Sequence, residues 1–239
     1  MILSLISAGA LASEPVDVEA LLNKADDVAR GQSSYAKLVM DVKTARYERS
    51  VTMEAWSEGT EKSLVVIREP AKEAGVATLM VDENIWNYLP KTDRTMKVPS
   101  GMMSDGWMGS HVSNDDLVKG SRLAEDYTWT LDAQPTDGVG NYVVTLVPHD
   151  DAPVVWGKVV VTINAEEIPV SMAYFDEDGT LERTMTWEDI QTIGGQRIPM
   201  VMSVLPAAKP DEYTRVTYKE LDFDVEVDPS RFTVQALRQ

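Results

Sequence analysis

The feature that most constrains the fold of this 239-residue chain is a period of two in its apolar residues, which recurs from Ser34 almost to the end. In the first run, Leu38, Met40 and Val42 point to one face, as expected for a half-buried strand. Similar runs follow, separated by Gly, Pro or charged turns, and Asp-Gly at 178–179 and Gly-Gly at 194–195 are strong hairpin signals. About eleven such runs, of which the last covers 213–223, predict one antiparallel sheet.

One segment near the N-terminus has helical periodicity instead. Asp17 is placed to cap this predicted helix and Gly31 to end it. Its apolar face comprises Val18, Leu21, Leu22, Ala25, Val28 and Ala29. With a single long amphipathic helix, two arrangements are open: the sheet curls around the helix or around a cavity.

The first twelve residues are apolar and end in Ala-Leu-Ala, which predicts a secretory signal peptide cleaved after Ala12. No linker or repeat divides the remainder, so we expect residues 13–239 to form a single domain. No run approaches the roughly 18 apolar residues of a membrane span, so we expect no stable membrane insertion. The chain has no cysteine, which excludes disulfides and thiolate chemistry.

The formal net charge is −17. Such a surface is repelled by nucleic acid and by anionic lipid headgroups, so we exclude nucleic-acid binding. Transient docking on a membrane protein stays open.

The sequence contains no catalytic signature. Its two histidines, His111 and His149, are isolated, and no cluster has the spacing of metal ligands. We therefore predict no catalytic, metal or cofactor site. A hydrolase acting on envelope polymers is the least favoured alternative, and it requires a polar cleft with convergent acids and a strongly shifted pKa.

An irregular segment rich in Gly, Ser and Pro carries large, soft apolar side chains: Met102, Met103, Trp107 and Met108. Flexible methionine-rich surfaces adapt to what they cover, so the segment either faces a ligand or closes the end of a core. After it, Ser113 precedes Asn114, Asp115 and Asp116, a pattern typical of a short capped helical turn.

An ordered set of short motifs resembles the outer membrane lipoprotein-sorting (LolA-like) family. In the first half these are Pro70, Gly75, Leu79, Trp86-x-Tyr88-Leu89-Pro90, Arg94, Trp107-Met108-Gly109-Ser110 and Ser113-x-x-Asp116-Leu117. In the second half they are Trp156-Gly157-Lys158-Val159, Asp176, Gly179, Gly195, Ile198-Pro199, Thr214 and Phe232-Thr233. The order of the set, which covers most of the chain, is more specific than any one motif. His111 and Val112 replace an acidic and an aromatic residue of the family pattern, so we expect different local contacts there.

The resemblance implies an incomplete, half-open antiparallel β-barrel around a hydrophobic cavity, with helices as a lid. It implies a periplasmic, monomeric carrier of lipid or lipoprotein acyl chains, with an inner-membrane transporter as a further partner. The alternative is a non-carrier accessory subunit that docks on an RND/MMPL- or ABC-type exporter and has a filled interior.

Under the carrier hypothesis we expect two groups of lipid-binding residues. The expected cavity lining is Leu38, Met40, Val51, Met53, Trp86 and Tyr88, and the expected lid is Met102, Met103, Trp107 and Met108. For each strand residue, a place in an ordinary filled core is the competing interpretation.

Overall fold

The structure is a computed structural model that describes residues 16–27, 31–119, 123–152 and 154–238. The predicted signal peptide, residues 1–12, lies outside the described residues, as do Val28 and Ala29 of the expected helical face. None of the helices in the described ranges is long and apolar enough to cross a membrane.

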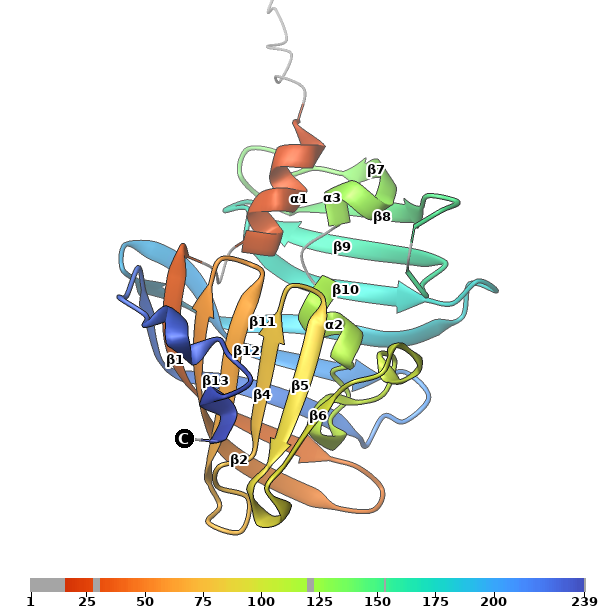
Figure 1. The fold of residues 1–239 in the computed structure, drawn as a ribbon. Helices are drawn as coiled ribbons and strands as arrows, with labels where there is room; N and C mark the ends of the chain where they lie inside the picture. Colours follow the sequence, from red (N-terminus) through yellow and green to blue (C-terminus); the bar gives the residue numbers. More distant parts are fainter. Residues whose placement is uncertain (1–15, 28–30, 120–122, 153, 239) are drawn as a thin grey trace, which may run out of the picture.

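One antiparallel sheet of thirteen strands forms most of the molecule (Figure 1). Its spatial order is β6-β5-β4-β3-β2-β1-β13-β12-β11-β10-β9-β8-β7, so the sheet is not closed and β6 and β7 are its edges. The strands are β1 (Ser33–Lys43), β2 (Glu48–Glu58), β3 (Lys62–Glu69), β4 (Ala77–Val81), β5 (Asn84–Leu89), β6 (Arg94–Lys97), β7 (Tyr127–Ala133), β8 (Asn141–Pro148), β9 (Lys158–Asn164), β10 (Pro169–Phe175), β11 (Leu181–Ile193), β12 (Gln196–Pro206) and β13 (Tyr213–Phe223). The half-open barrel is thereby confirmed.

The sequence underestimates the number of strands. Strand β6 was not expected, because Pro90 ends β5 and the residues after it show no alternation. In the structure Pro90–Thr92 forms a 3-10 turn, and Asp93 adopts a left-handed conformation with φ 46°. This reverses the chain, so that Arg94 pairs with Leu89.

Other sequence expectations hold closely. The last strand has the predicted bounds, and the turns at 178–179 and 194–195 join β10 to β11 and β11 to β12. Helix α1 (Val18–Asp27) begins where expected, and the Oδ1 atom of Asp17 accepts a hydrogen bond from the Ala20 N–H at 3.0 Å. Leu21, Leu22 and Ala25 bury the predicted face.

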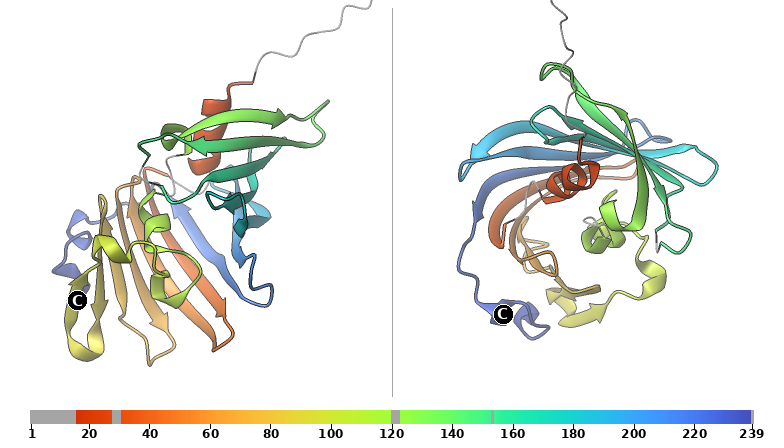
Figure 2. Two further views of the ribbon diagram at one scale, coloured as in Figure 1. Left: turned by 90° about the vertical axis from the view of Figure 1, so that its right-hand side faces the viewer. Right: turned by 90° about the horizontal axis from the view of Figure 1, so that it is seen from above.

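The sheet curls strongly, and α1 lies inside the curve at one end (Figure 2). Also inside are α2 (Asn114–Lys119) and the segment that leads to it, whereas α3 (Leu123–Asp126) precedes β7. The concave face therefore encloses both the helix and the irregular segment.

Two apolar clusters fill the concave face. The α1 cluster joins Leu22 of α1 to strands β7–β12, for instance through Leu146 and Ile163. The plug cluster joins β1, β2, β3, β12 and β13 and contains Trp107. Leu117 of α2 packs against both clusters.

A third cluster lies on the convex face. There Leu64 and Leu79 are covered by Phe232 and Leu237 from the C-terminal segment. The segment crosses the outside of β3–β5, so both faces of this part of the sheet are buried.

Candidate functional site

The site is built around residues 100–119, which we call the plug segment. It comprises the 3-10 turns Ser100–Met102 and Trp107–Gly109, followed by α2. Trp107 is only 6% exposed, and its Nε1 donates a hydrogen bond to Thr78 Oγ1 of β4 at 3.0 Å. An indole on an irregular segment is thus fixed against the concave face by both packing and a hydrogen bond.

One side chain of β2 and one of the turn between β1 and β2 hold the turn that follows Trp107. Arg49 of β2 donates from Nη1 to the Met108 carbonyl at 2.6 Å, and the hydroxyl of Tyr47 donates to the Gly109 carbonyl. Gly109 has φ 72°, and a Cβ there would lie 2.8 Å from the Tyr47 hydroxyl. Glycine is therefore required by both backbone conformation and space.

His111 and Val112, which replace the family's acidic and aromatic residues, make specific contacts. The backbone N–H of His111 donates to Thr214 Oγ1 at 2.9 Å. The ring Nδ1 also lies 2.9 Å from that oxygen, and Nε2 lies 3.1 Å from a carboxylate oxygen of Glu212. Val112 is buried in the α1 cluster. The plug segment is thereby joined to β13 as well as to β2 and β4.

An ion pair joins α2 to β11. Asp116 accepts two hydrogen bonds from Arg183, Nη1 to Oδ2 at 2.7 Å and Nη2 to Oδ1 at 2.6 Å. Asp116 also accepts from the Ser113 N–H, while its own N–H donates to the Ser113 hydroxyl. The capped turn predicted from the sequence is thus present, and the structure shows that the capping is reciprocal.

Both partners of this pair are largely buried. Burial disfavours the charged carboxylate of Asp116, but the hydrogen bonds and charge of Arg183 outweigh it and lower its pKa. Burial likewise opposes the charge on Arg183, and Asp116 overcomes this and raises its pKa. The guanidinium lies 4.7 Å from the ring centre of Trp156 and 4.5 Å from that of Tyr174, so it is also stabilised by two aromatic faces.

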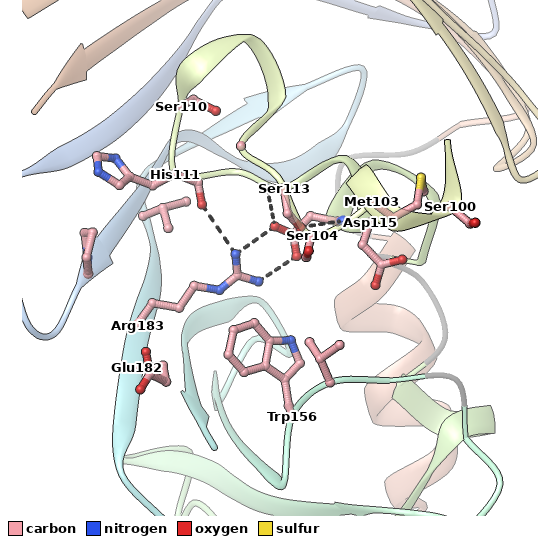
Figure 3. A pocket seen from close by; sticks show the side chains of 15 residues that line it. Ser100, Met103, Ser104, Ser110, His111, Ser113, Asp115, Trp156, Glu182 and Arg183 are labelled. Carbon is pink, nitrogen blue, oxygen red and sulfur yellow. Dashed lines mark hydrogen bonds and ion pairs between the residues drawn. The ribbon is translucent and has the colours of Figure 1, made fainter. Parts of the chain in front are cut away.

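A pocket of about 500 Å³ opens between the plug segment and strands β11 and β12 (Figure 3). Its lining is Ser100, Met103, Ser104, Gly106, Ser110, His111, Ser113, Asp115, Asp116, Val155, Trp156, Glu182, Arg183, Val204 and Pro206. Val204 and Trp156 also belong to the α1 cluster or pack on it, so the pocket has a polar side on the plug segment and an apolar side on the core. This size is typical of small-molecule sites.

The predicted cavity residues separate into two groups. Leu38, Met40, Val51 and Met53 lie together on the concave face, at most 8% exposed, in the plug cluster beneath Trp107. Trp86 and Tyr88 lie instead on the convex face, packed on Leu79 and the C-terminal segment. The reason is the strand alternation: in β5 the buried concave residue is Ile85, so its neighbour Trp86 points outward.

The predicted lid residues also differ from one another. Trp107 is buried and Met108 packs on the plug cluster, whereas Met103 lines the pocket. Met102 is 49% exposed. Only part of the predicted lid therefore contacts the core.

Sequence reasoning missed the polar centre of the site. Asp116 and Trp156 stand in the motifs of the resemblance, but no pattern indicated that they would meet Arg183. In the described ranges, no three His, Asp or Glu side chains are arranged to hold a metal ion.

Comparisons with known proteins bear on the fold. A family model described as "uncharacterized protein" matches residues 59–239. No curated protein matches the chain. A solved DUF1329 family protein from Desulfovibrio piger is similar with a TM-score of 0.82 at 20% identity, covering 94% of this chain and 100% of that one.

Two further solved structures are similar over almost their whole length. An outer membrane lipoprotein-sorting protein domain from Vibrio parahaemolyticus matches with a TM-score of 0.78 at 22% identity, covering 93% of this chain and 97% of that one. A LolA superfamily protein from Nitrosomonas europaea matches with a TM-score of 0.74 at 24% identity, covering 93% and 100%.

Proposed function

Since this chain belongs to the outer membrane lipoprotein-sorting (LolA-like) family, we propose that it is a periplasmic carrier of lipid or lipoprotein acyl chains. It shelters them from water and moves them between membranes or to and from a membrane transporter. The mature protein is the single domain 13–239, released from the signal peptide 1–12. N-terminal sequencing of the exported protein tests that boundary.

The physical need for a carrier follows from the cost of exposing an acyl chain. Each methylene exposed to water costs about 0.8 kcal/mol, so a chain of about fifteen methylenes costs about 12 kcal/mol. A carrier must cover such a chain with apolar surface and still release it.

The observation that carries the proposal is how the concave face is closed. Its apolar residues are covered by the plug segment, not by a second sheet, and the segment is tied down through side-chain hydrogen bonds such as Trp107 to Thr78 and Arg49 to Met108. A cover of this kind can move aside without breaking the sheet. Leu38, Met40, Val51 and Met53 then line the space for the acyl chain, and the pocket beside Arg183 is the entrance.

Native mass spectrometry of protein purified from the periplasm tests the proposal. We expect co-purified lipid on the wild type and none on the double variant Trp107→Asp/Met108→Asp, because two carboxylates cannot seal an apolar space. Met96→Asp is the matched control, since Met96 is 42% exposed on β6. Circular dichroism establishes that each variant keeps its sheet. A folded double variant with undiminished lipid contradicts the lid role, and a wild type without lipid contradicts the carrier function.

One observation favours the second candidate, an accessory subunit that docks on an exporter. Trp107 and Met108 already occupy the concave face, as a protein filled by its own side chains requires. That reading predicts no lipid on the wild type, together with co-purification of an intact inner-membrane transporter after mild solubilisation.

A further inference from the structure

We propose that one end of the sheet docks the protein on anionic phospholipid membranes. This end is formed by the turns that join β1 to β2, β3 to β4 and β5 to β6, and we call it the basic end. The inference goes beyond the proposed carrier function, because it concerns where the protein meets a membrane and not what it carries.

The three turns share one end because of the sheet topology. Strands β1 to β6 are neighbours in the order of the sequence, and in such an antiparallel sheet every second turn falls at the same end. The three turns lie along the lower edge of the molecule in Figure 1. The turns that join β2 to β3 and β4 to β5 lie at the opposite end.

The two ends differ in the sign of their charge. The basic end, counted as residues 43–49, 69–76 and 89–94 with Arg238, has seven basic and four acidic residues. Arg238 belongs to it because its Nε lies 3.7 Å from the carboxylate of Asp93. The opposite end, counted as residues 58–62 and 82–83, has four acidic residues and one basic residue. In a chain with a net charge of −17, the basic end is therefore a local reversal of sign.

The positive charge of the basic end is available to a partner. Three of its acids form ion pairs with cations of the same end, which are Lys43–Glu48, Arg49–Glu73 and Arg238–Asp93. Arg46, Lys91 and Arg94 are exposed, and none of them forms an ion pair within the described ranges. These three guanidinium and ammonium groups can therefore meet lipid phosphates without giving up a protein partner.

The neighbouring turn between β12 and β13 does not cancel this charge. It carries Lys209, Asp211 and Glu212, which add one net negative charge and leave the balance positive. Glu212 is turned inward, because it accepts a hydrogen bond from the Ala45 N–H at 2.9 Å and its side chain is only 11% exposed.

Exposed apolar side chains accompany the cations. Tyr47 in the β1–β2 turn is 41% exposed, and Leu89 at the end of β5 is 37% exposed. They are separated by the β3–β4 turn, whereas a protein partner would require a continuous apolar patch at the centre of its interface. Separate apolar side chains among cations suit the headgroup layer of an anionic membrane.

The acids elsewhere in the protein do not prevent docking at physiological salt. Strand β1 has eleven residues and spans about 35 Å. The screening length at 0.1 M salt is about 10 Å, so a membrane at the basic end is screened from the acids at the opposite end.

Docking in this orientation brings the plug segment close to the membrane. Tyr47 and Arg49, which belong to the basic end, donate to the carbonyls of Gly109 and Met108. The side chains that hold the cover of the concave face thus lie at the end that meets the lipid.

Vesicle co-sedimentation of the purified protein tests the inference. One set of vesicles contains only choline-headed phospholipid, and in the other about a third is glycerol-headed and anionic. At about 0.1 M salt we expect the wild type to bind the anionic vesicles more tightly, and at about 0.5 M salt we expect this preference to disappear. Sedimented protein measures docking whether or not any lipid enters the concave face.

The variant Lys91→Gln/Arg94→Gln should bind the anionic vesicles about 25-fold more weakly, at about fivefold for each lost charge. The matched control is Lys24→Gln/Arg197→Gln, which changes the net charge equally at exposed positions of α1 and β12 and should change binding less than about twofold. Circular dichroism establishes that both variants are folded.

Three results would overturn the inference: equal binding of the wild type to both kinds of vesicle, undiminished binding of Lys91→Gln/Arg94→Gln, or an equal loss in the control. A wild type that binds neither kind of vesicle also overturns it and leaves an acidic protein as the partner of this end. None of these results bears on the carrier function, which is tested by co-purified lipid.

Discussion

Asp116 at the start of α2 and Arg183 on β11 form a two-pronged ion pair, with N–O distances of 2.6 and 2.7 Å, that ties the plug segment to the sheet. The pair is far apart in sequence and largely buried, and one face of the guanidinium is covered by Trp156. Interactions within the plug segment alone cannot fix where it sits, whereas this pair sets its position on β11.

Removing one partner of the pair should be costly. We expect Asp116→Asn to lower the free energy of unfolding by about 3–5 kcal/mol, because it leaves the Arg183 charge buried without its counter-ion. Urea unfolding followed by circular dichroism measures this loss. The double variant Asp116→Leu/Arg183→Met should recover much of it, since neither charge is then buried alone. A double variant less stable than Asp116→Asn contradicts this explanation.

The same pair predicts a dependence on acid pH. The pKa of Asp116 is lower in the folded protein than its ordinary value of 3.8, so the unfolded chain binds the proton more readily. Asp116 therefore contributes fully to the free energy of unfolding above about pH 3.8. This contribution is lost as the pH falls through the lower pKa that Asp116 has in the folded protein. The difference in unfolding free energy between wild type and Asp116→Asn should narrow in urea titrations from about pH 6 down to about pH 3. If the difference between the two proteins stays constant over this pH range, the ionisation of Asp116 does not contribute to stability in this way.

Tyr127 predicts the opposite behaviour in alkali. Burial, followed by the nearby negative charge of Asp126, raises its pKa from 10.0 to about 12. Its contribution to stability is present below pH 10 and is lost as the pH rises toward 12, because only the unfolded chain ionises readily there. Tyr127→Phe should therefore lose less stability between these two pH values than the wild type does. Thermal unfolding at each pH measures the difference, and equal losses contradict it.

Two residues of the predicted lid, Trp107 and Met102, should differ sharply in their contribution to stability. Trp107→Ala opens a space in the plug cluster and removes the hydrogen bond to Thr78, so we expect it to cost about 3–5 kcal/mol. Met102→Ala, at a half-exposed position, should change stability by no more than about 0.5 kcal/mol. Chemical denaturation of both variants measures the two losses in unfolding free energy. A larger loss in Met102→Ala than in Trp107→Ala contradicts the prediction.

The convex face offers a further test. Phe232 of the C-terminal segment is 6% exposed and packs in the cluster that holds Trp86 and Tyr88. Phe232→Ala should cost about 3–5 kcal/mol in unfolding free energy. It should leave lipid binding intact if the cargo is held on the concave face. Loss of lipid from a folded Phe232→Ala variant would show that the convex face takes part.

Local sequence patterns were sufficient to predict much of the secondary structure. The alternation along Leu38, Met40 and Val42 gave β1 its buried face, and Asp17 marked the start of α1. The glycines at 179 and 194–195 marked turns, because their positive φ angles suit hairpin connections. These features depend on neighbours in sequence, which is why sequence alone could predict them.

Alternation cannot say which face of a strand is inside. Trp86 and Tyr88 share a face of β5, and nothing local showed that Phe232, far along the chain, would cover that face from outside. The order of the strands could not be predicted from local patterns either, because β1 pairs with β13, which lies near the other end of the sequence.

The sequence by itself therefore determined the elements: a capped amphipathic helix, a succession of strands and a capped turn at Ser113. Only the tertiary structure decided that Arg183 meets Asp116 between two aromatic rings, and that Trp107 closes the concave face. The physical reason is that periodicity and capping act over a few neighbouring residues. A pocket, in contrast, forms where distant segments are brought together by the curvature of the sheet.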